Sequence, residues 1–216
     1  MRLTILVLLG AAVSVVSSPA ADDELPISFG VKAGVPITDA FNTVKGDQSS
    51  YFTNTKRYLI GPTFELHLPL QFSIEVDALY RRLGYDYYEP QPGGAVFANT
   101  TANSWQFPIL VKWAFLPGPV RPFVDVGASV QHVSGIEQIL SSLAAIGIKT
   151  DRPAEFNTAT DVGLTVGGGV QFKVGPVRIS PEFRYTRWGS ETFRDPVQTF
   201  LNTNRNQGDF LLGLTF

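Results

Sequence analysis

Apolar and polar residues alternate along most of this chain, in eight separate segments. A period of two is typical of a β-strand with one oily face and one polar face. The predicted strands span residues 27–35, 58–68, 72–81, 104–115, 123–131, 161–173, 177–186 and 210–216. No apolar-face position in these segments carries a charge, so one face of every strand is oily throughout.

The polar face has an unusual composition, because it mixes Gly, Ser and Thr with acids and bases in near balance. A soluble sandwich turns its polar face to water. This composition instead suits a narrow interior, in which small side chains make room for ion pairs. The apolar face carries Tyr and Trp near strand ends, as in the aromatic girdles of membrane barrels. The pattern therefore favours strands that cross a membrane.

The connections between the predicted strands are short and long in strict alternation. Short turns lie around Pro69-Leu70, at 117–120 and at 174–176, and the long polar connections cover 36–56, 82–103, 133–160 and 188–207. Transmembrane barrels have short periplasmic turns and longer external loops. We predict an all-β fold, an eight-stranded antiparallel up-and-down transmembrane β-barrel with three short periplasmic turns and four long external loops. An even strand number leaves both termini in the periplasm.

Three predicted strands contain a proline, at Pro62, Pro108 and Pro181. A proline lacks the N–H that the strand ladder needs, and a barrel in lipid has no water to replace it. We therefore expect bulges or water-filled gaps at these positions.

Apolar residues recur at helical spacing in the third long connection, before Gly147. They are Ile136, Ile139, Leu140, Leu143 and Ala144. The pattern predicts a short helix that caps the outer rim, and the alternative is an element that binds lipid or a partner.

The first twenty residues have the pattern of a secretory signal peptide. Arg2 supplies a positive charge, residues 3–16 are apolar, and 17–20 offer the small residues that a signal peptidase reads. The apolar run is shorter than the roughly 20 residues that a membrane anchor needs. We expect cleavage after Ala20, which leaves residues 21–216 as one barrel domain.

Composition narrows the function classes. The chain has 216 residues and no Cys, which excludes disulfides, thiolate metal sites and lipid attachment through cysteine. The formal charge of −2 becomes −3 when Arg2 leaves with the signal peptide (−2 minus +1), so nothing suggests a nucleic-acid partner. We expect no cofactor.

The polar face also defines a set of charged side chains for the interior. The expected ion-pairing residues are Glu65, Glu75, Asp77, Arg81, Lys112, Asp125, Arg178, Glu182 and Arg184, and Arg57 and Lys173 are expected to point inward with them. Side chains fill the interior of an eight-stranded barrel. A tight turn at 117–120 places Phe115 opposite Pro122 and Lys112 opposite Asp125, which predicts an inward Lys112–Asp125 ion pair.

The chain ends in Phe-Leu-Leu-Gly-Leu-Thr-Phe at 210–216. With the strand pattern, this ending resembles the small bacterial outer-membrane β-barrel family, the group that includes the transmembrane domain of outer-membrane protein A. The resemblance covers the whole mature chain. It implies a monomer in the outer membrane that contacts lipid and lipopolysaccharide. It also implies that the barrel-assembly machinery recognises a terminal signal formed by Phe210, Leu212, Leu214 and Phe216.

Three functions are open at this point. A non-enzymatic barrel with a structural, envelope-integrity or loop-mediated binding or adhesion role needs no special motif. A lipid-modifying hydrolase would use His132 as the base that activates Ser134, although no orienting acid is identifiable. A narrow pore or transporter is the third. His67 is expected to be a hydrogen-bonded interior residue rather than a metal ligand. Arg82, Arg187 and Lys56 would meet lipopolysaccharide phosphates or lie on a solvated rim.

Overall fold

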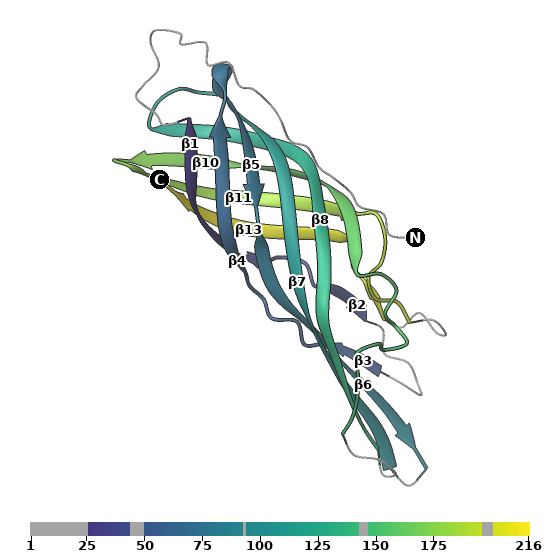
Figure 1. The fold of residues 1–216 in the computed structure, drawn as a ribbon. Coiled ribbons are helices and arrows are strands. Elements are labelled where there is room, and N and C mark those ends of the chain that lie inside the picture. Colours follow the sequence, from purple (N-terminus) through teal and green to yellow (C-terminus); the bar gives the residue numbers. More distant parts are fainter. Residues whose placement is uncertain (1–25, 44–49, 93, 143–146, 196–200) are drawn as a thin grey trace.

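A computed structural model describes residues 26–43, 50–92, 94–142, 147–195 and 201–216. Its strands form one closed antiparallel barrel (Figure 1). The barrel strands are β1 (Ile27–Pro36), β4 (Leu59–His67), β5 (Phe72–Asp77), β6 (Leu79–Gln91), β7 (Gly94–Ala114), β8 (Val120–Ser141), β10 (Thr160–Val174), β11 (Val177–Trp188) and β13 (Asn206–Thr215). Because β5 and β6 are two parts of one crossing, the barrel has eight strands, as the alternation predicted.

The barrel closes because β1 pairs with the last strand, β13, on one side and with β4 on the other. Along β1 the alternation seen in the sequence becomes two faces. Phe29 is 66% exposed on the outside, whereas Ser28 and Lys32 are only 1% and 2% exposed on the inside. An oily outer face and a polar inner face are what a barrel in lipid requires.

Three short connections and the C-terminus lie at the same end of the barrel. The first contains a short 3-10 turn, η1 (Pro69–Gln71), and the other two use glycines with positive φ, Gly118 and Gly175. These are the predicted short turns. In the described part of the chain, no helix has the length and apolar character to cross a bilayer.

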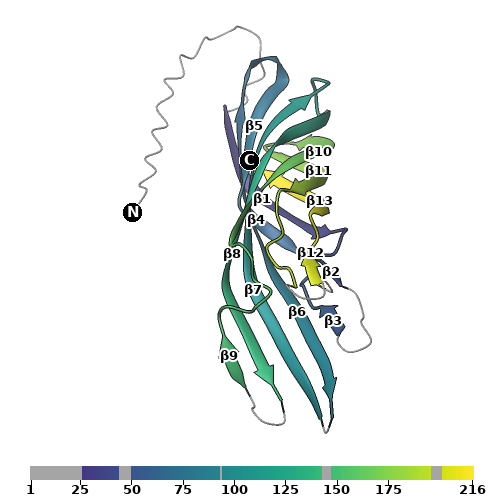
Figure 2. The same ribbon diagram turned by 90° about the vertical axis from the view of Figure 1, so that its right-hand side faces the viewer.

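At the opposite end, several strands continue well beyond the barrel (Figure 2). The sheet order there is β3-β6-β7-β8-β9, with β3 (Ser50–Thr53) and β9 (Ile148–Thr150) at its edges. We call this part the extension sheet. It consists of β3, residues 82–91 of β6, 94–103 of β7, 133–141 of β8, and β9. Strands β6 and β7 stay paired as far as Gln91 and Gly94.

The extension sheet corrects two expectations from the sequence. The connection at 82–103 is a continuous β-hairpin rather than a loop, and much of the segment after Val133 is strand. The predicted helix is also wrong, because Ile136, Ile139 and Leu140 belong to β8, while Leu143 and Ala144 lie outside the described residues. A helix this short is marginal by itself. The edge of β7 instead pairs with this segment, from Thr101 opposite Glu137 to Phe97 opposite Ser141.

The three prolines do not cause bulges in the described strands. Pro108 pairs with Ser129 and Pro181 with Leu212 without a change of register. Next to Pro62 and Pro108 the pairing is interrupted around Ala78, where β5 ends and β6 begins, and it resumes in the same register. The register shift instead lies between Thr101 and Asn103, opposite the positive-φ Gly135. The barrel tolerates these prolines by leaving short gaps in the ladder.

Connections from different parts of the chain pack together on the inner side of the extension sheet. A small second sheet joins β2 (Phe41–Thr43) to β12 (Leu201–Thr203), and Phe156 bridges to Phe193. Together with the strands they bury an apolar cluster, which we call the apolar cap: Ala40, Phe41, Tyr51, Leu83, Tyr85, Ala102, Val133, Phe193 and Leu201.

Candidate functional site

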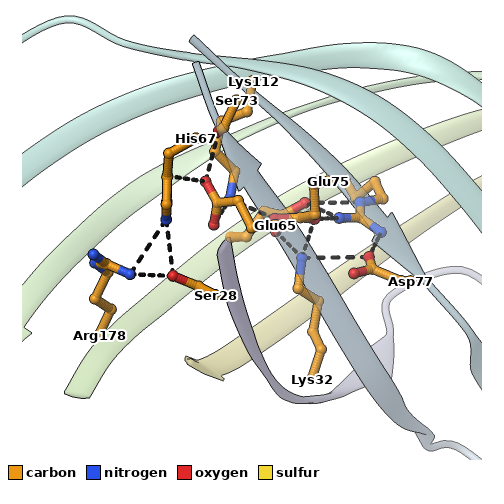
Figure 3. Close-up of polar contacts among 11 residues, drawn as sticks. Ser28, Lys32, Glu65, His67, Ser73, Glu75, Asp77, Lys112 and Arg178 are labelled. Carbon is orange, nitrogen blue, oxygen red and sulfur yellow. Dashed lines mark hydrogen bonds and ion pairs between the residues drawn. The ribbon is translucent and has the colours of Figure 1, made fainter. Parts of the chain in front are cut away.

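The centre of the barrel holds a network of buried ion pairs (Figure 3). We call it the lumen cluster, and it comprises Lys32, Glu65, Glu75, Asp77, Lys112, Glu182 and Arg184. Lys32 projects from β1 and contacts Glu75, Glu182 at 3.0 Å and Asp77 at 3.3 Å through its Nζ atom. Its three acidic partners come from β5 and β11, so the network ties distant strands together across the lumen.

Glu75 is the hub of this network because it contacts all three cations. Lys112 on β7 donates to Glu75 and lies 3.3 Å from Glu65. Arg184 on β11 reaches Glu75 at 2.9 Å and Asp77 at 2.8 Å. Four acids face three cations, so the cluster has a formal charge of −1 (3 minus 4). Buried charges cost much less when they are paired and hydrogen-bonded in this way.

The structure confirms the predicted register of β7 and β8 but not the predicted ion pair. Phe115 donates its backbone N–H to Pro122, and Lys112 lies opposite Asp125, with both side chains buried inside. The Lys112 ammonium instead turns to two acids, Glu65 and Glu75. In the described part of the chain, neither carboxylate oxygen of Asp125 has a hydrogen-bond partner. Lys112 gains more from two acids than from the single acid opposite it.

A glycine makes room for Asp125. Gly167 lies opposite Asp125 on β10, and a Cβ built at Gly167 would come within 2.6 Å of Asp125 Oδ1. A larger residue at Gly167 would therefore push against the carboxylate. The small residues on the polar face provide space for charges, as the sequence suggested.

Two predicted inward arginines contact polar side chains outside the lumen cluster. Arg81 is buried and donates to Gln207 Oε1 at 2.7 Å. Arg178 contacts Ser28 and lies 3.3 Å from His67 Nε2 (Figure 3). All nine predicted ion-pairing residues are thus buried, but Arg81, Arg178 and Asp125 are not members of the lumen cluster.

His67 is held between hydrogen-bonding groups. Its Nε2 atom lies 2.8 Å from Ser28 Oγ, and its Nδ1 atom lies 3.8 Å from Glu65 Oε1. The order Ser28, His67, Glu65 is that of a nucleophile, base and acid. Ser28 is only 1% exposed, however, so a substrate has no approach to its hydroxyl. This arrangement is that of an interior hydrogen-bond network.

The sequence reasoning missed one central member of the cluster and misplaced another charge. Lys32 lies on the polar parity of the first strand, and that parity was the available signal. It was missed because no partner for it is visible from one strand. Arg57, expected inside, has a 65% exposed side chain and pairs with Asp39 at 2.6 Å. Arg57 lies before β4 begins at Leu59, so the alternation of that strand does not include it. Lys173 is half-buried.

The proposed hydrolase pair lies on the outer surface. His132 and Ser134 share the outward face of β8, opposite Trp105 and Asn103 of β7. The His132 Nδ1 atom lies 3.0 Å from the hydroxyl of Thr160. In the described part of the chain no carboxylate approaches His132, and no hydrogen bond joins it to Ser134.

The apolar cap combines aromatic packing with hydrogen bonds to a half-buried carboxylate, Glu155. Phe193 packs edge-on against Phe41 and Tyr85, with ring centroids 5.8 and 5.7 Å apart. The hydroxyls of Tyr51 and Tyr85 donate to Glu155 at 3.1 and 3.4 Å. Burial, together with the charge of Glu155, raises the pKa of both phenols, so both stay protonated and keep donating.

The terminal residues form the seam that closes the barrel. Phe216 and Phe29 exchange two backbone hydrogen bonds, at 2.9 and 3.3 Å. Leu212, Leu214 and Phe216 expose their side chains on the lipid side, and Phe210 packs against Phe183 with centroids 4.9 Å apart. The four residues of the expected assembly signal therefore share one outward row.

Comparison with known protein families identifies the family of this chain. A family model described as outer membrane protein beta-barrel domain matches residues 17–189. Among curated proteins, none matches this sequence.

Several solved barrels are similar in structure. Neisserial surface protein A has a TM-score of 0.42 at 14% identity, over 88% of this chain and 96% of that protein. OprG from Pseudomonas aeruginosa has a TM-score of 0.48 at 12% identity, over 88% and 94%. The attachment invasion locus protein Ail of Yersinia pestis, solved with the heparin analogue sucrose octasulfate, has a TM-score of 0.41 at 12% identity, over 89% and 100%. Because the family model matches most of its length, the chain belongs to the outer-membrane β-barrel family and is a protein of the bacterial outer membrane.

Proposed function

We propose that this protein is a non-enzymatic outer-membrane barrel that acts through its external region, in envelope integrity or in binding at the cell surface. One observation carries the proposal. The lumen cluster fills the barrel and the apolar cap packs beyond it, so functional contacts fall to the external surface. External segments on a rigid barrel are well suited to binding.

A narrow pore is the less favoured alternative. Seven buried charged side chains cross the lumen and hold one another in ion pairs. Opening a path would separate these charges at a cost of several kcal/mol per unpaired ion. In planar bilayers we expect no stable conductance of porin size from the monomer. Reproducible large steps would favour transport instead.

The contacts of His132 and Ser134 do not favour a hydrolase. His132 is engaged by Thr160 and is not oriented by a carboxylate within the described residues. Exchanging His132 for Ala should therefore leave lipid composition unchanged in cells that express the protein. Loss of a lipid modification in that strain would contradict the proposal.

The proposed surface role implies several binding partners. Outer-leaflet lipid would cover the apolar belt, and lipopolysaccharide phosphates would meet the exposed rim cations Arg82 and Arg187. The barrel-assembly machinery would recognise the outward row that ends at Phe216, after signal-peptide cleavage behind Ala20. The mature protein would act as a monomer.

The test of the surface role is a shortened external hairpin. Replacing residues 87–98 by Asn-Gly, a two-residue turn that suits a hairpin, removes the tip of β6 and β7 and keeps Tyr85 in the apolar cap. The variant should insert normally but lose surface binding, measured as adhesion of cells and as resistance of the envelope to detergent. If a correctly folded variant keeps both properties, the external region is not the functional part.

A further inference from the structure

The outward face of the extension sheet carries an aromatic patch at its far end. Tyr88 and Phe97 pair directly across β6 and β7, with ring centroids 4.9 Å apart. They are 36% and 54% exposed, and Phe52 on the neighbouring strand β3 is 43% exposed. Exposed aromatic side chains that lie together on a soluble surface mark an interaction site.

Polar side chains lie directly beside this patch. In the next row of the sheet, Asp86 faces Phe52 on one side and Asn99 on the other. Asn99 donates to Asp86 at 2.5 Å, and neither side chain is buried, so the surface presents a carboxylate and an amide beside the rings. Aromatic rings flanked by a carboxylate and an amide suit a ligand that is apolar on its ring face and rich in hydroxyls at its edge.

The height of the patch excludes acyl chains as its partner. Tyr80 and Trp105 pair on the outside with centroids 5.2 Å apart and mark the outer membrane interface. From Tyr80 to Tyr88 the strand rises about 26 Å, or roughly 20 Å above the interface after allowing for strand tilt. Phospholipid headgroups extend only about 5–8 Å beyond the hydrocarbon core.

The patch belongs to the same face of the sheet as the lipid-contacting belt. β6 and β7 keep one register from Leu79 to Gln91, so Tyr80, Arg82, Asp86 and Tyr88 all point outward. Ascending this face, a ligand meets an apolar belt, then the rim cation Arg82, then aromatic and amide groups. Lipopolysaccharide presents acyl chains, phosphates and sugars in that same order. This outward face continues the lipid-facing side of the barrel wall, so it turns toward the lipopolysaccharide molecules around the protein.

We propose that Phe52, Tyr88 and Phe97, with Asp86 and Asn99, form a saccharide-binding face for the core sugars of lipopolysaccharide in the surrounding outer leaflet. The C–H faces of the sugar rings stack on the aromatic rings, and the hydroxyls bond to the carboxylate and the amide. This inference rests on the proposed surface-binding role and assigns it a ligand class.

The test is a competition within one membrane disc. The protein is assembled into nanodiscs with equal amounts of two lipopolysaccharides, one with a complete core oligosaccharide and one truncated near lipid A. Mass spectrometry then measures which form is retained around the protein. We expect about fivefold enrichment of the complete form, the size of effect that stacked aromatic contacts produce.

Matched variants separate this face from the rest of the external region. Tyr88→Ser with Phe97→Ser should abolish the enrichment. Ile148→Ser should keep it, because Ile148 is also 54% exposed but pairs with Leu140 on the other face. Heat-modifiable migration on gels verifies that each variant is folded. Arg82→Ala should weaken retention of both lipopolysaccharides equally and so reports on the rim phosphates.

Equal retention of both forms by the wild type would overturn the saccharide assignment. If Arg82→Ala still lowered both, the proposed surface role would stand. Enrichment that survives the double serine variant would place the sugar contact elsewhere and overturn the assignment. Binding of soluble foreign glycans without enrichment of the complete form would overturn the choice of ligand. A change of oligomeric state in the serine variants would instead assign the patch to a second copy of the chain.

Discussion

Strand β6 buries the charged Arg81 beside Leu79 at membrane level, and it buries Leu83 and Tyr85 above that level. Its inward Arg81 is 1% exposed and hydrogen-bonded, whereas the next inward residues, Leu83 and Tyr85, belong to the apolar cap. Its outward residues change in the opposite sense, from the aromatic Tyr80 to the polar Arg82. β6 and β7 stay paired through this level. The inner face therefore changes from polar to apolar, and the outer face from apolar to polar, without a break in the ladder.

The same exchange occurs on the neighbouring strands. On β7 the inward residues change from Gln106 and Ser104 to Ala102, and on β8 they change from Gln131 to Val133. Arg81 pairs with Ser104, and Ser104 with Val133, so the change falls within one row across three strands. This row marks the level at which the outside of the barrel changes from lipid to water.

The medium outside the sheet explains the two kinds of interior. Below the row, lipid takes most of the apolar side chains, and the interior holds polar groups that must pair with one another beside a small cluster of Leu59, Leu79 and Leu211. Above it, water takes most of the polar side chains, and the residues of the apolar cap are buried as in a soluble protein, while Phe52, Tyr88 and Phe97 stay exposed on the outer face. Each region therefore depends on different interactions, and separate substitutions should reveal this.

Deleting Phe216 should have the largest effect, because it damages the seam that both regions need. The deletion removes the two backbone hydrogen bonds with Phe29 and the terminal aromatic side chain. An open strand edge is poorly tolerated in lipid. The amount of folded protein in isolated outer membranes should fall sharply. Wild-type levels of the truncated protein would show that neither the seam nor the signal depends on this residue.

Glu75→Ala should destabilise the membrane-level region strongly. It removes the acid that contacts Lys32, Lys112 and Arg184, so the free energy of unfolding should fall by about 3–5 kcal/mol. Urea unfolding in lipid vesicles, followed by tryptophan fluorescence, measures the loss. Stability close to wild type would mean that the remaining acids redistribute around the three cations.

Phe193→Ala should affect mainly the external region. Phe193 is 1% exposed and contacts Phe41, Tyr85 and Phe156, so its truncation should cost about 3 kcal/mol of local stability in the apolar cap. Hydrogen exchange of the cap residues should accelerate, while the unfolding midpoint of the barrel stays the same. A parallel drop in barrel stability would show that the two regions unfold as one unit.

Asp125→Asn should have the smallest effect, below about 1 kcal/mol and of either sign. Its carboxylate lacks a hydrogen-bond partner in the described structure, so the substitution breaks no contact, and the relief of a buried charge is offset by burial of an amide that also lacks a partner there. The urea experiment used for Glu75→Ala provides a direct comparison. A loss of several kcal/mol would indicate that Asp125 pairs with Lys112 after all.

Much of the barrel could be predicted from alternation because lipid imposes a strict rule on every outward position. The strand number, the short turns and the pairing of Lys112 opposite Asp125 all follow from parity and turn length. The extension sheet did not follow, because above the membrane the outward face becomes polar and the segment around Leu140 has the spacing of a helix. The ion-pair partner of an inward charge could not be predicted either. Alternation tells which face a side chain lies on but not which side chain it contacts.

The sequence by itself determined the closed barrel, its oily belt and most of the charges inside, because each depends on which face of one strand a residue occupies. Only the tertiary structure decided that Glu75 joins three cations, that Asp125 has no hydrogen-bond partner among the described residues, and that Phe41, Phe193 and Leu201 meet above the lumen. These contacts bring together residues far apart in the chain. Their strengths depend on distances across the lumen, which alternation along a single strand does not encode.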